Sequence, residues 1–575
     1  MQYMNPMLGT DFYKIGHIFQ YPKGTAEIYS NFTPRSDRLY KVNEKFNPHG
    51  VINFGLQAYI MYALQMHFNS QFFNQPRDIV LNEYQRTVSK ALGSEIDITH
   101  IADLYDLGYL PIEIKALPEG SLVPCKVPLF TVRNTQEKFF WLTNYIETWL
   151  SADIWAMTTN ATIAFAYRCI LEKFAVETGS PLDFVKWQGH DFSARGMSTL
   201  SSAVVISQGH LTSFLGTDTI GAINSIEAYY GGLDTFVGGS VPATEHSVMC
   251  AGGEEDEIET FRRILKTYPS GIVSIVSDTW DFWNVVGDDT SIAAQLKDEI
   301  LNRKENALGI AKTVFRPDSG NPADILCGTI VHAGSINEAI DILRYDTGWQ
   351  EGEEYGPFSV TETFLIEGKY YKITVEPEFN RHDKRFYYID GWGKPTIEEV
   401  AVTPEKKGAV ECLWDIFGGT INEQGYKVLN PRVGLIYGDS ITTDRAIDIL
   451  QRLKDKGFAS CNVVFGIGSF TYQYNTRDTF GFAMKATHAK IEGQSKDLFK
   501  NPKTDNGVKK SAKGYLRVEK DEQGNYVLFD QQTEEQEAQG ELETVFKDGK
   551  LVKFQNIVDI RARVDAEVQR MLSKM

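Results

Sequence analysis

Residues 433–457 read VGLIYGDSITTDRAIDILQRLKDKG and contain one complete strand, loop and helix pattern. The apolar run 433–437 predicts a buried strand, and the polar residues 438–440 predict a loop at its carboxyl end. Thr442 or Thr443 can cap the helix that follows, and Gly457 can end it. Apolar strands that alternate with amphipathic helices predict a parallel sheet or barrel buried on both faces.

The same order of apolar run and polar, glycine-rich loop recurs along the chain. Loops with this pattern are 190–196 (HDFSARG), 215–219 (LGTDT), 277–279 (SDT), 316–322 (RPDSGNP) and 466–469 (GIGS). In parallel folds, the loops at the carboxyl ends of the strands carry the chemistry. One such loop alone is more often an ordinary turn, but a series in one register favours a functional site. The series therefore predicts an α/β fold built on a parallel sheet or barrel.

Residues 238–247, GGSVPATEHS, place a single histidine between a carboxylate and a hydroxyl. A histidine beside an acid can be held in one tautomer and used as a base or as a phosphate acceptor. A histidine that is simply hydrogen-bonded in the structure is the competing interpretation. His246 is therefore a candidate functional residue.

The loops and several further segments resemble the type II phosphoribosyltransferases, and the resemblance runs from about residue 8 to about residue 562. The further segments are 10–14 (TDFYK) with His17, 110–116 (LPIEIKA), 141–148 (WLTNYIET), 476–478 (TRD), 499–502 (FKNP) and 544–550 (TVFKDGK). The resemblance implies transfer of the phosphoribosyl group of phosphoribosyl pyrophosphate (PRPP) to nicotinamide. The products are nicotinamide mononucleotide and pyrophosphate, formed in NAD salvage. The alternatives are a nicotinate-specific member of the superfamily and a catalytically silent binding or signalling protein on the same fold.

Composition is that of a cytosolic enzyme with small-molecule substrates. The 575 residues can bury a large core in two or more structural domains. The formal net charge of −18 argues against broad nucleic-acid binding. The six cysteines lack the C-x-x-C spacing of a zinc site. No signal sequence and no apolar run of membrane-spanning length are evident, so we expect a cytoplasmic protein without a membrane partner.

The implied reaction breaks a C–O bond while positive charge grows on the sugar and a polyanion leaves. It needs cations and Mg²⁺ on the pyrophosphate, although the sequence does not identify the metal ligands. Arg316 and Asp318, on either side of Pro317, resemble the ribose and phosphate pair of the family, and an ordinary ion pair is the alternative. The resemblance also implies substrate binding by Gly438, Asp439 and Arg35.

Residues 466–469 can present backbone N–H groups to a phosphate at the start of a helix. The family has a longer glycine run here, whereas this chain has Ser469-Phe470 after Gly468. A family hydroxyl two residues before Lys485 is replaced by Ala483. We expect phosphate binding to be retained with altered contacts. The lysine-rich segment 500–513 is either a further phosphate site or a solvated basic loop, and the resemblance favours the phosphate site.

The resemblance implies that nicotinamide stacks between Phe192 and the Tyr13 of a partner subunit, with Arg195 beside it. Asp218 is the candidate specificity residue. Its carboxylate can accept hydrogen bonds from the carboxamide NH₂ and would repel the carboxylate of nicotinic acid. A helix N-cap is the alternative role, and the two roles can coexist.

His246 matches the family histidine that ATP phosphorylates transiently, which couples ATP hydrolysis to tighter substrate binding. Glu245 and Asp278 are the candidate carboxylates that orient this histidine, and Asp278 is the first choice. ATP coupling rests on the resemblance alone, because the chain has no Walker A loop.

The resemblance implies an α/β barrel-like central domain from residues 161–479, and a second, mixed α+β domain of sheet and helices built from the terminal segments 1–160 and 480–575. The resemblance implies a homodimer with shared active sites. The residues expected to face the partner's pocket are Tyr13, Arg477, Lys485, Lys500 and Lys509.

Residues 323–403 are the one long segment outside the resemblance, and they read as an insertion. The runs 360–366 and 370–375 alternate around Glu367-Gly368 and predict a hairpin, and 385–389 predicts another strand. Pro404 is expected at the first position of the helix that follows. The position of the insertion after Asp318 suggests a lid or a regulatory or oligomer contact, and a tolerated surface decoration is the alternative.

Overall fold

The computed structural model describes residues 4–346, 359–375, 378–380, 385–387, 395–438, 441–500 and 512–575. They form two compact units. The first unit contains residues 1–173, 185–240 and 466–575, and the second contains residues 174–184 and 241–465. Units defined by packing need not coincide with domains, so the domain boundaries given above stay a prediction.

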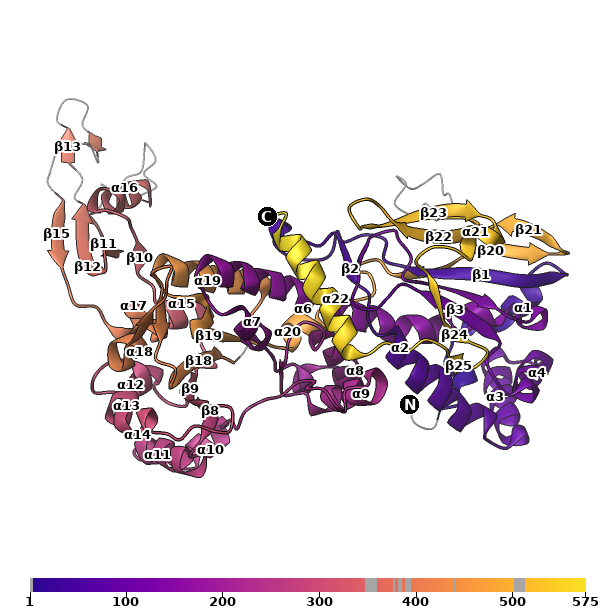
Figure 1. Cartoon of the computed structure of the whole chain (residues 1–575), viewed down its shortest axis with the longest axis horizontal. Helices are drawn as coiled ribbons and strands as arrows, with labels where there is room; N and C mark the ends of the chain where they lie inside the picture. Colours follow the sequence, from indigo (N-terminus) through magenta and orange to yellow (C-terminus); the bar gives the residue numbers. More distant parts are fainter. Residues whose placement is uncertain are drawn as a thin grey trace. The chain divides into compact units, whose positions relative to one another are not determined.

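A seven-stranded antiparallel sheet forms the centre of the first unit, and both ends of the chain contribute to it (Figure 1). Its order is β21 (Gln494–Asp497), β20 (Ala483–Ile491), β1 (Thr25–Thr33), β5 (Phe130–Asn134), β3 (Ile112–Ala116), β24 (Glu543–Lys547) and β25 (Lys550–Leu551). Phe32 of β1 stacks on Phe130 of β5 and on Phe482, with ring centroids 5.0 and 5.3 Å apart. These aromatic contacts fix β1 against strands more than 90 residues away in the sequence.

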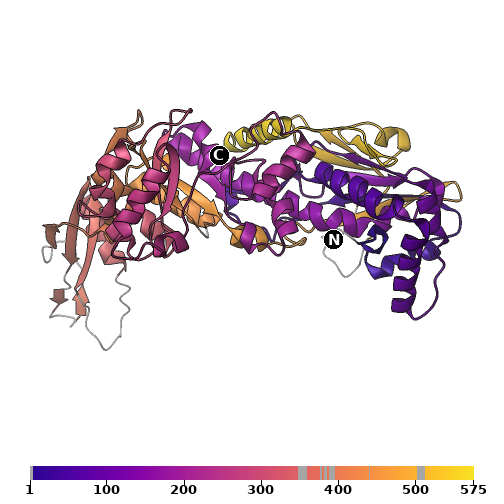
Figure 2. The ribbon, with the colours of Figure 1, turned by 90° about the horizontal axis from the view of Figure 1, so that it is seen from below.

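Helices from distant parts of the chain also build the first unit, as Figure 2 shows for α22 (Ile557–Leu572, yellow) and the indigo and purple helices. Arg563 of α22 donates to the carbonyl of Glu119 at 2.6 Å. Arg561 of α22 donates to the carbonyls of Leu211, Phe236 and Val237. The last helix thus fixes chain segments that precede it by more than 300 residues.

The second unit contains a parallel sheet in the order β19 (Val463–Ile467), β18 (Val433–Tyr437), β9 (Ala311–Arg316) and β8 (Gly271–Val276). The last residues of β19, 466 and 467, belong to the first unit. The parallel pair β6 (Gly189–Asp191) and β7 (Gly216–Thr217) also belongs to the first unit. The backbone N–H of Phe192, just after β6, donates to the carbonyl of Ile467 at 3.0 Å. The predicted α/β class with a barrel-like parallel sheet is confirmed.

Helix α19 (Thr443–Asp455) forms where the sequence predicts it. The hydroxyl of Thr442 accepts from the backbone N–H of Arg445 at 3.3 Å and caps the helix. The helix buries its apolar face, and Gly457 ends it with a φ of +74°. Residues of the buried face include Ala446, Ile449, Leu450 and Leu453.

The insertion has a hydrophobic core of its own. Strands β11 (Val360–Ile366) and β12 (Lys369–Val375) pair in full register around Glu367-Gly368, so the predicted hairpin is confirmed. With β10 (Val331–His332) and β15 (Thr396–Glu399) they form a four-stranded sheet, and α16 (Ile336–Asp346) packs on it (Figure 1). β14 (Arg385–Tyr387) pairs with β13 (Glu378–Asn380), and residues 388–389 of the predicted strand lie outside the described residues.

Two glycines in close contact, Gly328 and Gly408, flank the part of the chain that forms the four-stranded sheet of the insertion. Gly328 ends α15 (Pro322–Cys327) and Gly408 precedes α18 (Ala409–Phe417), with φ values of +78° and +84°. A Cβ on Gly408 would lie 2.2 Å from the backbone nitrogen of Gly328. α17 (Pro404–Lys407) begins at the predicted proline just before this crossing.

A buried ammonium group clamps the same crossing. Lys456 Nζ donates to the carbonyls of Cys327 and Lys407 and lies 2.6 Å from Glu411 Oε2. The hydroxyl of Tyr370, in hairpin strand β12, donates to Glu411 Oε1. Burial and the nearby Glu411 carboxylate raise the pKa of Tyr370 above its ordinary value, so this tyrosine stays protonated and continues to donate. The insertion is therefore held where it joins the rest of the second unit, by the close backbone contact of Gly328 with Gly408 and by the Lys456–Glu411 ion pair.

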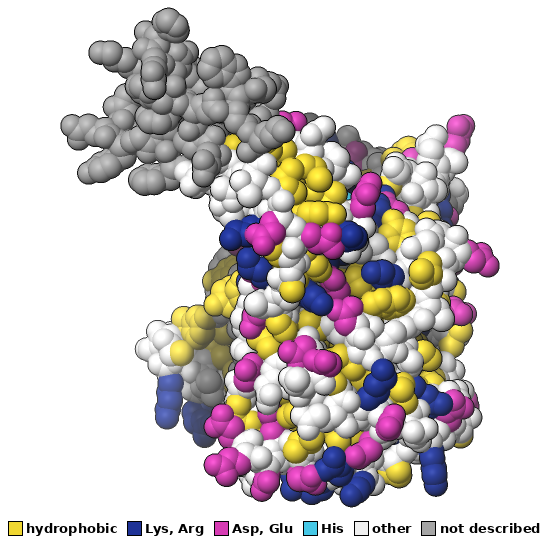
Figure 3. Space-filling model, turned by 90° about the vertical axis from the view of Figure 1, so that its left-hand side faces the viewer, with side chains coloured by type: hydrophobic (Ala, Val, Ile, Leu, Met, Phe, Trp, Pro, Cys, Tyr) yellow, Lys and Arg dark blue, Asp and Glu magenta, His cyan; other side chains and the backbone are white. Residues whose placement is uncertain are grey.

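On the face drawn in Figure 3, Lys and Arg side chains are interspersed with Asp and Glu. Within the described part of the chain, no helix is both long and apolar enough to cross a membrane.

We predict that Gly408→Ala lowers the free energy of unfolding by at least about 2 kcal/mol more than Gly418→Ala. Gly418 is a matched control, because it also has positive φ (66°) with extended ψ, but a Cβ there would meet open space. Urea unfolding of both variants measures the difference. Equal losses would contradict a close backbone crossing at the root of the insertion.

Candidate functional site

The ends of β6 and β7 are tied together by the buried carboxylate of Asp191. Its Oδ1 accepts from the backbone N–H of Ser193 at 2.9 Å. Its Oδ2 accepts from the hydroxyls of Thr217 and Thr219 at 3.3 and 3.1 Å. The backbone N–H of Asp218 donates to the carbonyl of Asp191 at 3.0 Å. One carboxylate therefore positions the two loops that carry Phe192 and Asp218.

Asp218, His190, Phe192 and Ser240 form a set that we call the Asp218 cluster. Asp218 Oδ1 accepts from the hydroxyl of Ser240 at 2.5 Å and lies 2.9 Å from His190 Nε2. The Asp218 side chain is 43% exposed, whereas that of His190 is 11% exposed. The N-cap residue of α9 (Ile220–Tyr230) is Thr219, and the Asp218 carboxylate binds His190 and Ser240.

Phe192 is half-buried, and its ring centroid lies 4.5 Å from that of His190 at an interplanar angle of 34°. Arg195 is exposed on the short 3₁₀ helix η7 (Ala194–Gly196). A Cβ on Gly196 would lie 2.0 Å from Ser469 Oγ, so Ser469 occupies space beside this turn. The structure thus places the predicted phosphate-loop residues next to the segment that carries Arg195.

Gly468 is the N-cap residue of α20 (Ser469–Gln473), as predicted for a loop that opens a helix. The backbone N–H of Ser198 donates to Gln473 Oε1 at 2.8 Å, which joins α20 to the same turn. Ala483, where the family has a hydroxyl, is buried at the start of β20 and pairs with Thr33.

His210 connects α8 (Leu200–His210) to α20. Its Nε2 faces the carbonyl of Gly216 at 2.9 Å and its Nδ1 faces the hydroxyl of Tyr472 at 2.7 Å. A carbonyl can only accept, so Nε2 carries the proton and Nδ1 accepts from Tyr472. Complete burial lowers the pKa of His210 to about 4, and the ring is neutral at pH 7.

In the second unit, His246 begins α10 (His246–Cys250) and its side chain is 47% exposed. Its Nδ1 lies 3.2 Å from the hydroxyl of Thr279. Its Nε2 lies 4.0 Å from Asp278 Oδ1 and 3.9 Å from Asp318 Oδ2. The structure therefore brings His246 near both aspartates, but the direct hydrogen bond goes to Thr279. Orientation by Asp278 stays a prediction.

Glu245, the other predicted orienting carboxylate, is the N-cap residue of α10 and accepts from the hydroxyl of Ser247. The Glu245 carboxylate thus binds a hydroxyl within its own turn, and its orientation of the His246 imidazole stays a prediction. Thr279 was missed as an imidazole partner, although it stands in the quoted SDT loop.

Asp278 organises the loop after β9. Its Oδ2 accepts from the backbone N–H of Asp318 at 2.8 Å and from the hydroxyl of Ser319 at 2.6 Å. Its Oδ1 is buried and has no hydrogen-bond partner among the described residues. Arg316 Nη2 donates to the carbonyl of Thr244 at 2.8 Å, two residues before His246. The predicted residues Arg316, Asp318, Asp278 and His246 thus lie in one cluster, the His246 cluster.

Gly438 packs directly against this cluster. A Cβ at Gly438 would lie 2.1 Å from Asp318 Oδ1 and 3.5 Å from Arg316 Cδ. Glycine is therefore required here for close approach, which the sequence motif alone does not reveal. Asp439, predicted beside it, lies outside the described residues.

Four cations of the first unit lie near one another and form the cation cluster: Arg35, Arg477, Lys485 and Lys500. Partial burial lowers the pKa of Lys485, and the charges of the other three cations lower it further, while Glu147 acts in the opposite direction. Burial and then Arg477 also lower the pKa of Arg35, whose Nε donates to the carbonyl of Gly481 at 2.6 Å. Mutual repulsion of this kind is relieved when an anion binds.

Tyr13, predicted to reach the partner's pocket, is 63% exposed on η2 (Phe12–Gly16), and its ring packs edge-on against His17 at 5.1 Å. Lys509 lies outside the described residues. Lys500 and Arg477 are exposed, and Arg477 is 3.8 Å from Asp478.

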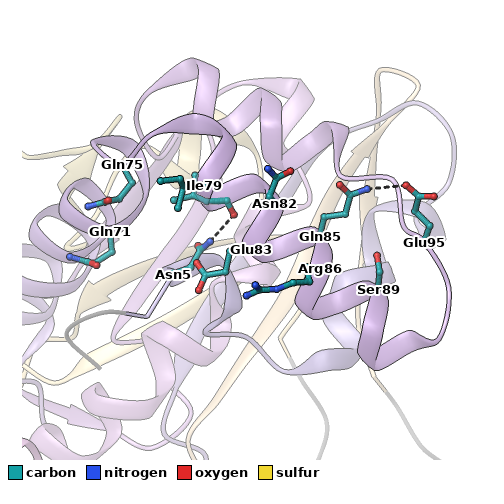
Figure 4. Close-up of a pocket in the computed structure, with 11 residues that line it drawn as sticks. Asn5, Gln71, Gln75, Ile79, Asn82, Glu83, Gln85, Arg86, Ser89 and Glu95 are labelled. Carbon is teal, nitrogen blue, oxygen red and sulfur yellow. Dashed lines mark hydrogen bonds between the residues drawn. The ribbon is translucent and has the colours of Figure 1, made fainter.

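A cavity of about 780 Å³ lies elsewhere in the first unit, beside α3 (Arg77–Leu92) (Figure 4). Its lining is rich in amides and includes Asn5, Gln71, Gln75, Asn82 and Gln85. Asn5 Nδ2 donates to the carbonyl of Val80 at 3.0 Å. None of the predicted site residues lines this cavity, so it is not the candidate site.

The described residues contain no group of three or more His, Cys, Asp or Glu side chains that could hold a metal ion. Mg²⁺ is commonly held by one or two carboxylates together with substrate phosphates. Asp278 and Asp318 fit that requirement, and they do not form a metal cage by themselves.

We predict that His210 stabilises the fold in a pH-dependent way. Its pKa is about 4 when folded and 6.5 ordinarily, so its contribution is complete above pH 6.5 and is lost as the pH falls from 6.5 to 4. The stability advantage of the wild type over His210→Gln, which keeps a donor for Gly216, should therefore shrink across this interval. Urea unfolding at several pH values measures it. A difference that does not vary with pH would contradict a buried neutral His210.

Comparisons with known proteins show the family of the chain. Residues 187–550 match the model of the nicotinate phosphoribosyltransferase (NAPRTase) family, and residues 5–114 match the N-terminal domain of nicotinamide phosphoribosyltransferase. The chain is 48% identical over 568 residues to the nicotinamide phosphoribosyltransferase of Acinetobacter baylyi, with 98% of each chain covered. It is 32% identical to that of Mycoplasma pneumoniae, over 88% of this chain and 93% of the relative.

Among solved structures, human nicotinic acid phosphoribosyltransferase is similar with a TM-score of 0.49 and 12% identity, covering 98% of this chain and 94% of that one. The family model spans more than half of the chain, and the relative from Acinetobacter baylyi spans nearly all of it. The chain belongs to the nicotinate phosphoribosyltransferase (NAPRTase) family.

Proposed function

We propose that the protein transfers the phosphoribosyl group of PRPP to nicotinamide, giving nicotinamide mononucleotide and pyrophosphate in NAD salvage. The observation that carries this proposal is the partly exposed Asp218 carboxylate, fixed by His190 and Ser240 near the half-buried ring of Phe192. The name of the 48% identical relative supports the same substrate.

The Asp218 cluster suits nicotinamide better than nicotinic acid. The carboxamide NH₂ donates hydrogen bonds, which a carboxylate accepts, whereas nicotinic acid carries a negative charge that a carboxylate repels. Phe192 offers an aromatic face to the electron-poor pyridine ring. Arg195, and Tyr13 of a partner subunit, complete the base site in this proposal.

Arg35, Arg477, Lys485 and Lys500 bind the phosphates of PRPP together with the loop at Gly468 and Ser469. Burial and then repulsion among these cations lower the pKa of Lys485 and of Arg35, and relief of that repulsion favours a polyanionic ligand. Arg316 and Asp318 bind the ribose and its phosphate. Mg²⁺, when bound through the pyrophosphate and the Asp278 and Asp318 carboxylates, neutralises charge on the leaving group.

In this proposal His246 accepts the γ-phosphoryl group of ATP and ADP leaves. Hydrolysis of the phosphohistidine to phosphate favours substrate binding. Thr279 fixes Nδ1, which leaves Nε2 as the nitrogen that attacks. Asp278 and Asp318 lie 4.0 and 3.9 Å from Nε2, where they can orient the ring.

The protein acts as a cytoplasmic homodimer on small molecules. The exposed Tyr13 and the cation cluster lie on surfaces that a second subunit can use, which supports shared sites.

We predict that the wild type makes mononucleotide from PRPP, Mg²⁺ and nicotinamide, and that Asp218→Asn lowers the ratio of kcat/KM for nicotinamide to that for nicotinic acid by roughly 10- to 100-fold. Asparagine keeps the size of the side chain and one acceptor but removes the charge. Quantifying both mononucleotides by chromatography measures the ratio. No product from either base would overturn the proposed activity, and an unchanged ratio would remove Asp218 from base selection.

Gly438→Ala is expected to lower kcat/KM by about 10- to 100-fold, because its Cβ displaces the Asp318 carboxylate. Gly434→Ala is the control in β18, the strand that leads to Gly438, because a Cβ there would lie no closer than 3.2 Å to the Lys312 side chain. Steady-state kinetics and thermal unfolding are measured for both variants. Similar activity losses in the two variants would show that the contact with Asp318 is not needed.

Incubation with ATP labelled at its γ-phosphate should give a base-stable, acid-labile label on the wild type, as a phosphohistidine would. His246→Asn should abolish both this label and the stimulation of product formation by ATP. Cys250→Ser, four residues along α10, is the control and should keep both. Stimulation that survives in His246→Asn would exclude the phosphohistidine route.

A further inference from the structure

His190 is the one residue of the Asp218 cluster that contacts both candidate base-binding side chains. Its Nε2 lies 2.9 Å from Asp218 Oδ1, and its ring centroid lies 4.5 Å from that of Phe192. His190 is also the first residue of the loop 190–196 (HDFSARG). Because His190 contacts both the Asp218 carboxylate and the Phe192 ring, it can hold the two side chains in place together.

The backbone fixes the place of this imidazole ring. His190 pairs with Gly216 in the parallel register of β6 and β7, and a Cβ at Gly216 would lie 2.8 Å from His190 Nδ1. The ring therefore lies so close to residue 216 that this position must be glycine. With 11% of its side chain exposed, it has little freedom to leave this position.

The hydrogen bond fixes the direction of the Asp218 carboxylate in turn. A neutral imidazole has one N–H donor, and the proton belongs on Nε2, where a carboxylate oxygen faces it. Ser240 donates to the same oxygen, so two donors from different segments converge on Oδ1. A carboxylate that is 43% exposed would otherwise lose orientation to solvent-driven rotation.

We propose that His190 is a specificity-determining positioning residue, which holds the Asp218 carboxylate against the base while its ring supports Phe192. This inference rests on the proposed nicotinamide transfer. Without His190 the carboxylate keeps Ser240 as a donor but loses one of the two contacts that fix its direction, so it accepts less well from a carboxamide and repels a carboxylate less strongly. Loss of His190 therefore reduces discrimination between the two bases, and it raises KM for nicotinamide more than it lowers kcat.

The test compares His190→Phe with His190→Gln. Phenylalanine keeps a ring against Phe192 and lacks the donor, whereas glutamine keeps an N–H donor and lacks the ring. We expect His190→Phe to lower the nicotinamide to nicotinic acid ratio of kcat/KM by about 10-fold or more. His190→Gln should restore part of that ratio, and Ser240→Ala should lower it in the same direction.

His100→Phe is the control, because His100 is a buried histidine of α4 (Thr99–Leu107) that packs edge-on against Trp141. This variant can lower thermal stability, but it should leave the nicotinamide to nicotinic acid ratio of kcat/KM unchanged. A folded His190→Phe with a wild-type ratio overturns the inference while the proposed function stands. A wild type that does not use nicotinamide overturns the proposed function and this inference with it.

Discussion

The buried carboxylate of Asp191 is the constraint on which the Asp218 cluster depends. It accepts one backbone N–H from the loop that follows β6, the hydroxyl of Thr217 at the end of β7, and the hydroxyl of Thr219 in the loop that follows β7. Parallel strands bring their carboxyl ends to one edge, but they do not orient the loops beyond that edge. A buried carboxylate with three donors does so, because leaving any of its acceptor sites unpaired in the interior is costly.

The second unit repeats this logic with different residues. Asp278 uses one oxygen to hold the backbone of Asp318 and the hydroxyl of Ser319, and keeps its other oxygen buried near His246. Gly438 provides the room for Asp318. In both units a carboxylate at the end of one strand positions the loop of the next strand, and the side chains that remain exposed, Asp218 and His246, are those proposed to act on substrates.

Local structure could be predicted from the sequence where short-range signals agree. The cap of α19 at Thr442, its end at Gly457 and the hairpin around Glu367-Gly368 each follow from residues that are close in the chain. The partners of the functional side chains could not be predicted in this way. His190 and Ser240 lie 28 and 22 residues from Asp218, and Thr279 lies 33 residues from His246, so only the folded register brings them together. The contact of Gly328 with Gly408 spans the whole insertion and leaves no local signal beyond two glycines.

In the proposed function, the Asp218 cluster selects a neutral carboxamide over a carboxylate. A competition reaction with wild-type protein, PRPP, Mg²⁺ and equal concentrations of nicotinamide and nicotinic acid tests it directly, because the ratio of the two mononucleotides equals the ratio of the two kcat/KM values. We expect nicotinamide mononucleotide to exceed nicotinic acid mononucleotide by at least about 10-fold. Equal amounts, or an excess of the nicotinic acid product, would contradict it.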